Sequence, residues 1–204
     1  MELEPGLFLF QGLLTRAEQV VLWDACREMA EGPVPMYTPT VRGGRKMSVG
    51  MLCLGRHWNG QTYSYEPVRS DYDGLQVPAI PESLASIAAG AAARAGYTLA
   101  ADICIVNRYE AESRMGVHQD KDERAETLAA GVPIVSVSIG DAARFVIGGL
   151  ARRDPTRPLI LRSGDVLVMG GPSRLRFHGV TRILTGTAPE ATGPGRFNLT
   201  FRQW

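Results

Sequence analysis

The segment GVHQDKDE, residues 116–123, places a histidine two residues before an aspartate in a chain with only three histidines. In an extended strand, residues i and i+2 point to the same side, so His118 and Asp120 could present two metal ligands together. His178, in RLRFHGV, could supply a third. His-x-Asp followed by a distant His is the spacing of the facial triad, which binds Fe(II) and leaves positions open for oxygen and a co-substrate. The alternative is a solvated, charged turn.

The C-terminal segment GRFNLTFR offers an independent test. Strand alternation places Arg196, Asn198 and Arg202 on one face and the apolar side chains on the other. The two arginine Cα atoms would lie roughly 20 Å apart, and their planar guanidinium groups suit a dicarboxylate held between them. In IVNRY, Asn107 and Tyr109 share a face in the same way. An iron triad beside such a strand implies 2-oxoglutarate as co-substrate. The alternatives are an edge strand with one wet face, and a buried tyrosine next to a turn-forming asparagine.

Two helices and many short strands are expected to position these residues. Residues 15–31 form an amphipathic pattern in which Thr15 and Glu18 predict a capping box. Residues 82–95 predict a second helix, which ends at a glycine. From about residue 102 onward, short β-branched or alternating runs are separated by Gly, Pro and Asp, which is typical of a sandwich or barrel. We therefore expect an α+β fold in a single globular unit.

The bulk properties narrow the class of protein. A chain of 204 residues with 45% hydrophobic and 21% charged residues is typical of one globular domain. The three cysteines are widely spaced and form no CxxC motif, so neither a disulfide framework nor a structural zinc site is expected. There is no apolar run long enough for a membrane span, and the start lacks the basic region of a signal peptide. We expect a cytoplasmic monomer.

The net charge of +1 identifies no partner, but the charges are unevenly distributed. Between Gly32 and Tyr65 there is no acidic residue, and basic residues alternate with aromatic ones. Positive charge attracts phosphates, and aromatic faces stack on unpaired bases. The pattern favours nucleic acid slightly over its alternative, a solvated basic loop with a few core aromatics. The basic residues are Arg42, Arg45, Lys46 and Arg56, and the aromatic ones are Tyr37, Trp58, Tyr63 and Tyr65.

In order along the chain, the segments IVNRY, HQDKDE, PIVSVSIG, GDVLVMGG, SRLRFHG and RFNLTFR closely resemble the AlkB family of Fe(II)- and 2-oxoglutarate-dependent dioxygenases. The likeness runs from about residue 36 to the C-terminus and is nearest to the bacterial members that repair alkylated DNA. It implies a double-stranded β-helix, or jelly roll, with N-terminal helices buttressing one side. It also implies an N-terminal strand and helix extension over residues 1–35 and a dioxygenase domain over residues 36–204, with a nucleotide-recognition lid at about 36–70.

The resemblance also implies roles for individual residues. The iron ligands, which form the catalytic centre, would be His118, Asp120 and His178. The residues that hold 2-oxoglutarate would be Asn107, Tyr109, Arg196, Asn198 and Arg202. On the substrate side, Asp122 would meet the exocyclic group of the damaged base, and Arg152 would lie nearby. Base-stacking and phosphate-side aromatics would be Trp58, Tyr63 and Tyr65. His57 is expected to lie in the lid or at the surface and not to bind the metal.

The implied activity is oxidative demethylation of 1-methyladenine and 3-methylcytosine in DNA, with Fe(II), 2-oxoglutarate and O2, and with release of formaldehyde. The target base would be single-stranded or flipped out of a duplex, and an anionic Asp122 would attract the cationic base. The alternatives are the same chemistry on RNA or on a protein, and a jelly-roll binding protein with a vestigial site. Strand parity would place Asp122 on the side of His118 and Asp120, with Gln119 and Lys121 opposite. It suggests no role for Glu123.

Overall fold

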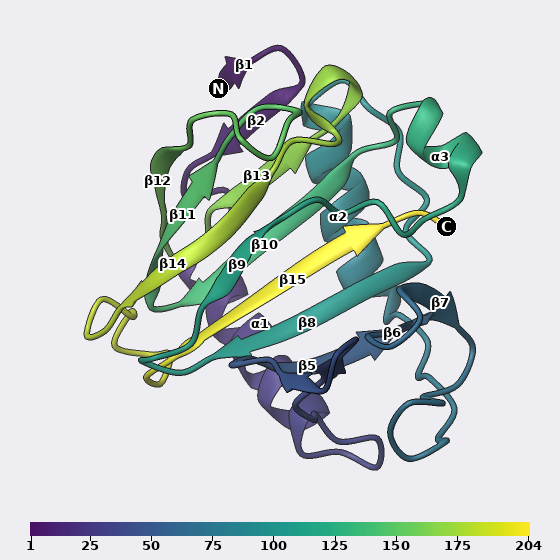
Figure 1. Cartoon of the computed structure of the whole chain (residues 1–204). Coiled ribbons are helices and arrows are strands. Elements are labelled where there is room, and N and C mark those ends of the chain that lie inside the picture. The colour runs from purple at the N-terminus through teal and green to yellow at the C-terminus, as the bar shows by residue number, and fades with distance from the viewer.

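Two antiparallel β-sheets face each other in the computed structural model, which describes residues 1–204 (Figure 1). The larger sheet contains, in spatial order, β1 (Glu2–Glu4), β2 (Leu7–Phe10), β13 (Val166–Met169), β10 (Ile134–Gly140), β15 (Arg196–Arg202), β8 (Ile103–Tyr109) and β5 (Gly50–Leu54). The smaller sheet contains β12 (Arg157–Leu161), β11 (Ala142–Ile147), β14 (His178–Leu184) and β9 (Met115–His118). This is the jelly-roll arrangement that the sequence predicts.

Helices α1 (Arg16–Ala30) and α2 (Glu82–Arg94) pack on the outer face of the larger sheet, behind it in Figure 1. The predicted capping box is present at α1: the Thr15 hydroxyl accepts from the Glu18 backbone N–H, and the Glu18 carboxylate accepts from the Thr15 backbone N–H. A short helix α3 (Ala125–Ala129) and a 3-10 turn (Gly171–Ser173) lie in the connections. Both predicted helices are confirmed to within one residue at each end.

The C-terminal strand β15 separates the apolar core from the polar interior. It pairs with β10 on one side and β8 on the other, so it is a central strand and the edge-strand alternative is wrong. Its apolar residues Phe197, Leu199 and Phe201 pack in the core beneath the helices. Its polar residues point the other way, into the space between the two sheets, and Arg196 and Arg202 are both buried there. The alternation read from RFNLTFR is confirmed.

Residues 1–35 contribute directly to this framework. Strand β2 pairs with β13, and the α1 residues Leu22, Trp23 and Cys26 are buried in the core. Residues 36–70 supply β5 at the edge of the larger sheet and two short ladders. These are β3 (Thr40–Val41) with β4 (Arg45–Lys46), and β6 (His57–Asn59) with β7 (Ser64–Glu66). All three cysteines are buried and free, as expected. None of the helices combines the length and the apolar character that crossing a membrane requires.

Candidate active site

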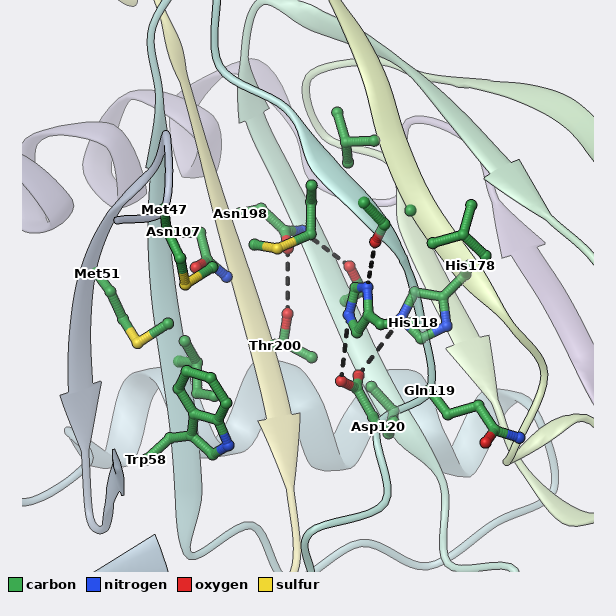
Figure 2. A pocket seen from close by; sticks show the side chains of 18 of the residues that line it. Met47, Met51, Trp58, Asn107, His118, Gln119, Asp120, His178, Asn198 and Thr200 are labelled. Atoms are coloured by element: carbon green, nitrogen blue, oxygen red, sulfur yellow. Dashed lines mark hydrogen bonds and ion pairs between the residues drawn. The ribbon is translucent and has the colours of Figure 1, made fainter. Parts of the chain in front are cut away.

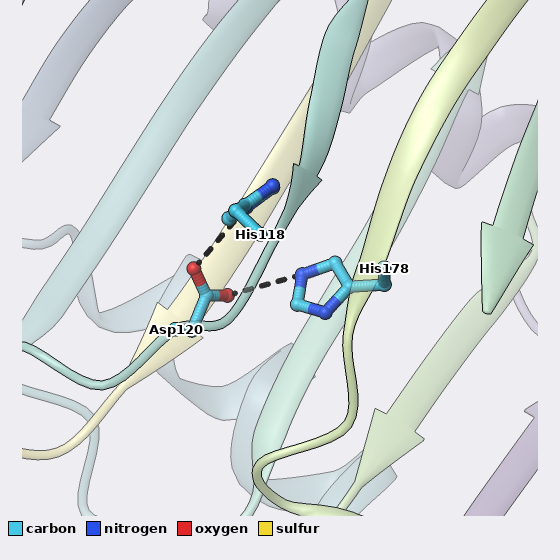
Figure 3. Close-up of side chains that lie close together, drawn as sticks. All are labelled: His118, Asp120 and His178. Carbon is cyan, nitrogen blue, oxygen red and sulfur yellow. Dashed lines mark ion pairs between the residues drawn. The ribbon is translucent and has the colours of Figure 1, made fainter. Parts of the chain in front are cut away.

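His118 and His178 are brought together by strand pairing. His118 ends β9, His178 begins β14, and the two are register partners. Asp120 completes the cluster, with its carboxylate oxygens 3.5 Å from His118 Nε2 and 3.5 Å from His178 Nε2 (Figure 3). One ligand atom from each residue lies within 4.8 Å of the others. The three predicted ligands therefore converge on one point.

Hydrogen bonds to the outer nitrogens orient both imidazoles for metal binding. Nδ1 of His118 lies 2.7 Å from the Gly116 carbonyl oxygen, and Nδ1 of His178 lies 2.9 Å from that of Arg176. Because a carbonyl oxygen only accepts, each Nδ1 donates its proton outward, and each Nε2 faces Asp120 on the side where a metal would be held. Two imidazoles, each oriented by a hydrogen bond to a backbone carbonyl, and one carboxylate fit a facial Fe(II) site.

Asp120 remains anionic although its side chain is only 9% exposed. Burial raises the pKa of its carboxyl, but the Arg202 guanidinium and the two histidines outweigh that effect and hold this pKa well below its usual range. The Arg202 terminal nitrogen lies 2.7 Å from the Asp120 carboxylate. Asp120 is therefore available as a charged ligand.

A buried chain of alternating charges extends from Asp120 and explains Glu123. Arg202 contacts Asp120 on one side and Glu123 on the other, where Nε and Oε1 are 3.4 Å apart. The second Glu123 oxygen lies 3.0 Å from Arg174. Arg174 also donates to the backbone carbonyl of Asp120 at 2.6 Å. Glu123 thus holds two arginines, and one of them supports the backbone of a metal ligand.

The parity expected past Asp120 is wrong, because β9 ends at His118 and the chain leaves the strand there. Gln119 and Lys121 also border the cavity that Asp122 lines. The Gln119 amide donates to the Leu175 carbonyl at 2.6 Å, so this side chain also ties the loop to the turn before β14. Asp122 still reaches the substrate side, where its carboxylate accepts from Trp58 Nε1 at 2.8 Å.

Arg196 is a buried cation without an anion. It is 1% exposed and forms no ion pair; it donates to Ser138 Oγ at 2.8 Å and more weakly to two backbone carbonyls, while its Nε has no partner. Burial lowers the pKa of its guanidinium to about 10. An uncompensated buried charge is costly, so this position is suited to an incoming carboxylate. Its cross-strand partner Tyr109 points into the same cavity.

Two side-chain amides, one on β8 and one on β15, lie between Arg196 and Arg202. Asn107 and Asn198 are register partners, and Asn107 Oδ1 is buried without a partner. Asn198 Nδ2 donates to Ser136 Oγ at 2.8 Å (Figure 2). Guanidinium groups at both ends and amides between them fit a short dicarboxylate such as 2-oxoglutarate. Ser136 and Ser138, which sequence reasoning missed, are signalled by the alternation of polar and apolar residues in PIVSVSIG.

The metal cluster, Arg196, Arg202 and the amide pair line one cavity of about 870 Å³ between the sheets, and every residue predicted for the site contributes to its wall. Figure 2 shows the metal cluster on one side and Trp58 and Met51 on the other, with Asn107 and Asn198 between them. The residues at this second side form the part of the wall opposite the metal cluster.

The predicted substrate residues differ in how far they are free to bind. Trp58 meets the ring of Tyr63 edge-on, with centroids 5.6 Å apart, and the Arg42 guanidinium lies 5.3 Å from the Tyr63 centroid. Tyr63 is exposed, whereas Tyr65 is buried and its hydroxyl accepts from Arg202. Arg152 is exposed at the cavity wall and donates to the Val117 carbonyl at 3.2 Å.

The expectation that His57 lies in the lid or at the surface needs a correction. His57 is 0% exposed, so it is not a surface residue. It belongs to β6 within the segment proposed as a lid, and it is not part of the metal cluster.

Gly179 sets the separation of the two strands that carry the histidines. A β-carbon there would lie 2.7 Å from the Met115 carbonyl oxygen on β9. We expect Gly179→Ala to push β9 away from β14, to lower the free energy of unfolding by about 1–3 kcal/mol, and to weaken metal binding. Thermal unfolding and Mn(II) titration measure both effects.

Gly116→Ala is the matched control, because a β-carbon at this β9 position meets nothing within 4 Å. Equal stability and equal Mn(II) affinity in the two variants would show that the approach of these strands does not control the site.

Comparison with known proteins agrees with this geometry. Residues 6–202 match the model of the 2OG-Fe(II) oxygenase superfamily. The alpha-ketoglutarate-dependent dioxygenase AlkB of Escherichia coli is 44% identical over 98% of this chain and 91% of its own length. The DNA N(6)-methyladenine demethylase ALKBH1C of Arabidopsis thaliana is 38% identical over 99% of this chain, which spans about half (49%) of that relative. The solved structure of OsALKBH1 superposes with a TM-score of 0.94 at 39% identity, covering 100% of this chain and 99% of that one.

Proposed function

The chain belongs to the 2OG-Fe(II) oxygenase superfamily, in its AlkB family, and from that premise we propose that it removes methyl groups oxidatively from ring nitrogens of DNA bases. The expected substrates are 1-methyladenine and 3-methylcytosine. The observation that carries the proposal is the buried, unpaired Arg196 in the same cavity as the converging His118, Asp120 and His178 cluster. This cavity has a place for a metal and a place for a dicarboxylate.

Each part of the cavity then has a distinct role. His118, Asp120 and His178 hold Fe(II), which together with 2-oxoglutarate and O2 supplies the oxidising chemistry. Asn107, Tyr109, Arg196, Asn198 and Arg202 hold 2-oxoglutarate. The product of methyl oxidation is a hydroxymethyl base, which releases formaldehyde.

Residues 36–70 form the proposed nucleotide-recognition lid, and the other end of the cavity receives the base. Trp58 and Tyr63 offer aromatic faces for stacking, and Arg42, Arg45 and Lys46 on the neighbouring β3–β4 ladder offer charge to phosphates. We infer a monomer that takes a base from single-stranded DNA or from a flipped-out position. Three free cysteines support a reducing compartment, which we propose is the cytoplasm.

The test is formaldehyde release from single-stranded oligonucleotides that carry one modified base. The purified chain is incubated with Fe(II) and 2-oxoglutarate, and 1-methyladenine, 3-methylcytosine and unmodified DNA are compared. Release from the two methylated oligonucleotides, abolished by a chelator, is the expected result. Succinate formation without formaldehyde from any nucleic acid would redirect the proposal to a protein substrate. The same lesions placed in RNA separate DNA from RNA.

N6-methyladenine in DNA is a second candidate, favoured by the similarity of 99% of this chain to about half (49%) of the DNA N(6)-methyladenine demethylase ALKBH1C. Asp122 distinguishes the candidates, because 1-methyladenine and 3-methylcytosine are cationic whereas N6-methyladenine is neutral. Asp122→Asn keeps an oxygen that accepts from Trp58 and removes only the charge. We expect kcat/KM to fall about tenfold for the cationic bases, since Coulomb attraction in a partly screened site is worth about 1–4 kcal/mol.

N6-methyladenine serves as the neutral control for that variant. Its turnover should change little when Asp122 loses its charge. An equal loss on cationic and neutral bases would mean that Asp122 acts by holding Trp58 and not by its charge.

A further inference from the structure

His57 and Trp58 are neighbours on β6 and point in opposite directions. Trp58 lines the cavity, whereas the His57 side chain is buried outside the cavity wall. There, His57 Nε2 lies 2.5 Å from Asp71 Oδ1. The second Asp71 oxygen accepts from the Gly60 backbone N–H at 3.1 Å, just after β6 ends. One carboxylate thus holds both the side chain and the backbone of the strand that carries Trp58.

The loop that supplies Asp71 is itself firmly anchored. Arg69 is 2% exposed, donates to the Pro35 carbonyl at 2.8 Å, and places its guanidinium 4.8 Å from the Tyr37 ring centroid and 5.0 Å from that of Tyr72. The Tyr37 hydroxyl lies 3.3 Å from His57 Nε2 and closes the cluster from the other side. This segment is therefore a brace behind β6.

Trp58 depends on such a brace. The β6–β7 ladder has only three residues in each strand, and a short two-stranded ladder is marginally stable alone. On the cavity side, Trp58 makes one hydrogen bond, to Asp122, and one edge contact, with the exposed Tyr63. Behind the indole, Trp58 packs against an apolar cluster that includes Tyr37, and Tyr37 in turn contacts His57.

We propose that His57 and Asp71 form a positioning pair that fixes Trp58 at the mouth of the cavity and so determines affinity for the flipped base. This rests on the proposed function in that the ligand is a nucleobase. The pair contacts neither the metal cluster nor Arg196 or Arg202. Its effect should therefore be confined to the part of the cavity that Trp58 lines. Displacement of a positioning group by about 1 Å is enough to cost up to about a hundredfold in rate.

The first test follows Trp58 itself, without nucleic acid. The chain has three tryptophans, so protein labelled with 5-fluorotryptophan gives a separate ¹⁹F resonance for each, and Trp58→Phe assigns the one of interest. His57→Leu should shift or broaden this resonance. His57→Gln should restore it, because a glutamine amide nitrogen lies close to the position of Nε2 and still donates to Asp71. An unchanged Trp58 resonance in His57→Leu overturns the proposal.

The second test measures binding of a single-stranded oligonucleotide with one 3-methylcytosine. Asp71→Ala and His57→Leu should weaken binding about tenfold, within the range that misplacement of a contact group costs. Asp73→Ala is the matched control in the same loop: Asp73 pairs with Arg69 but does not contact His57. Equal weakening by Asp71→Ala and Asp73→Ala overturns the specific role of the pair.

Affinity for 2-oxoglutarate in the Mn(II)-loaded proteins separates positioning from general damage. It should be retained in His57→Leu and Asp71→Ala, and its loss in both would overturn the proposal. If the wild-type chain binds no methylated oligonucleotide, the proposed function is refuted. The positioning role of His57 and Asp71 is then decided separately by the Trp58 resonance of the free protein. If His57→Leu does not fold, Asp71→Ala provides both readouts.

Discussion

Asp120→Ala is expected to abolish demethylation and to destabilise the protein at the same time. The substitution removes the one anionic ligand of the metal cluster, and activity should fall by more than the ~10–100-fold that loss of an outer-shell partner costs. It also leaves Arg202 buried with Glu123 as its only carboxylate neighbour. Removing one member of a buried ion pair costs about 3–5 kcal/mol. Formaldehyde release and Mn(II) titration measure the loss of the metal site, and denaturant unfolding of the metal-free protein measures the loss of stability.

Asp120→Asn separates the two causes. The amide keeps the shape of the side chain and an oxygen that accepts from Arg202, so much of the stability should return. Metal affinity should remain low, because a neutral amide is a weaker ligand than a carboxylate for Fe(II) or Mn(II). An Asp120→Ala protein that still binds Mn(II) as tightly as wild type would refute the assignment of the metal site.

The parts of the site that lie on strands could be predicted because a strand has a two-residue period. Arg196 and Arg202 follow from the alternation of RFNLTFR, and Asn107 and Tyr109 follow from that of IVNRY. His118 and Asp120 follow from the same period, whereas His178 was predicted from the spacing of His-x-Asp and a distant His. The pairing of β9 with β14, which places His118 opposite His178, is a long-range contact that periodicity does not reveal.

Where the chain leaves a strand, periodicity gives no direction. Glu123 could not be explained from HQDKDE, since its partner Arg174 precedes β14 and its partner Arg202 ends β15. His57 was expected in the lid or at the surface, because it lies next to Trp58 in the segment that resembles the family's lid. Its burial results from contacts with Tyr37 and Asp71, both distant in sequence.

Arg196→Met should have opposite effects on co-substrate binding and on the stability of the ligand-free protein. The guanidinium is the buried cation that a carboxylate of 2-oxoglutarate would neutralise, and truncating one partner of such a pair costs about 2–5 kcal/mol of binding. The KM for 2-oxoglutarate should therefore rise by at least about thirtyfold. Without ligand, however, the wild-type cation is unpaired. Replacing it by an apolar side chain of similar length should leave the free energy of unfolding unchanged or raise it.

Weaker 2-oxoglutarate binding together with unchanged or higher stability distinguishes a ligand-binding arginine from a structural one. If Arg196 served mainly to hold Ser138 and the nearby carbonyls, Arg196→Met would destabilise the free protein as much as it weakens binding. Arg196→Lys keeps the charge without the planar fork, so it should recover only part of the affinity. Thermal unfolding with Mn(II), measured with and without 2-oxoglutarate, reports both quantities in one experiment. The wild type should gain stability from 2-oxoglutarate and Arg196→Met should gain little, because the co-substrate stabilises the fold only to the extent that it binds.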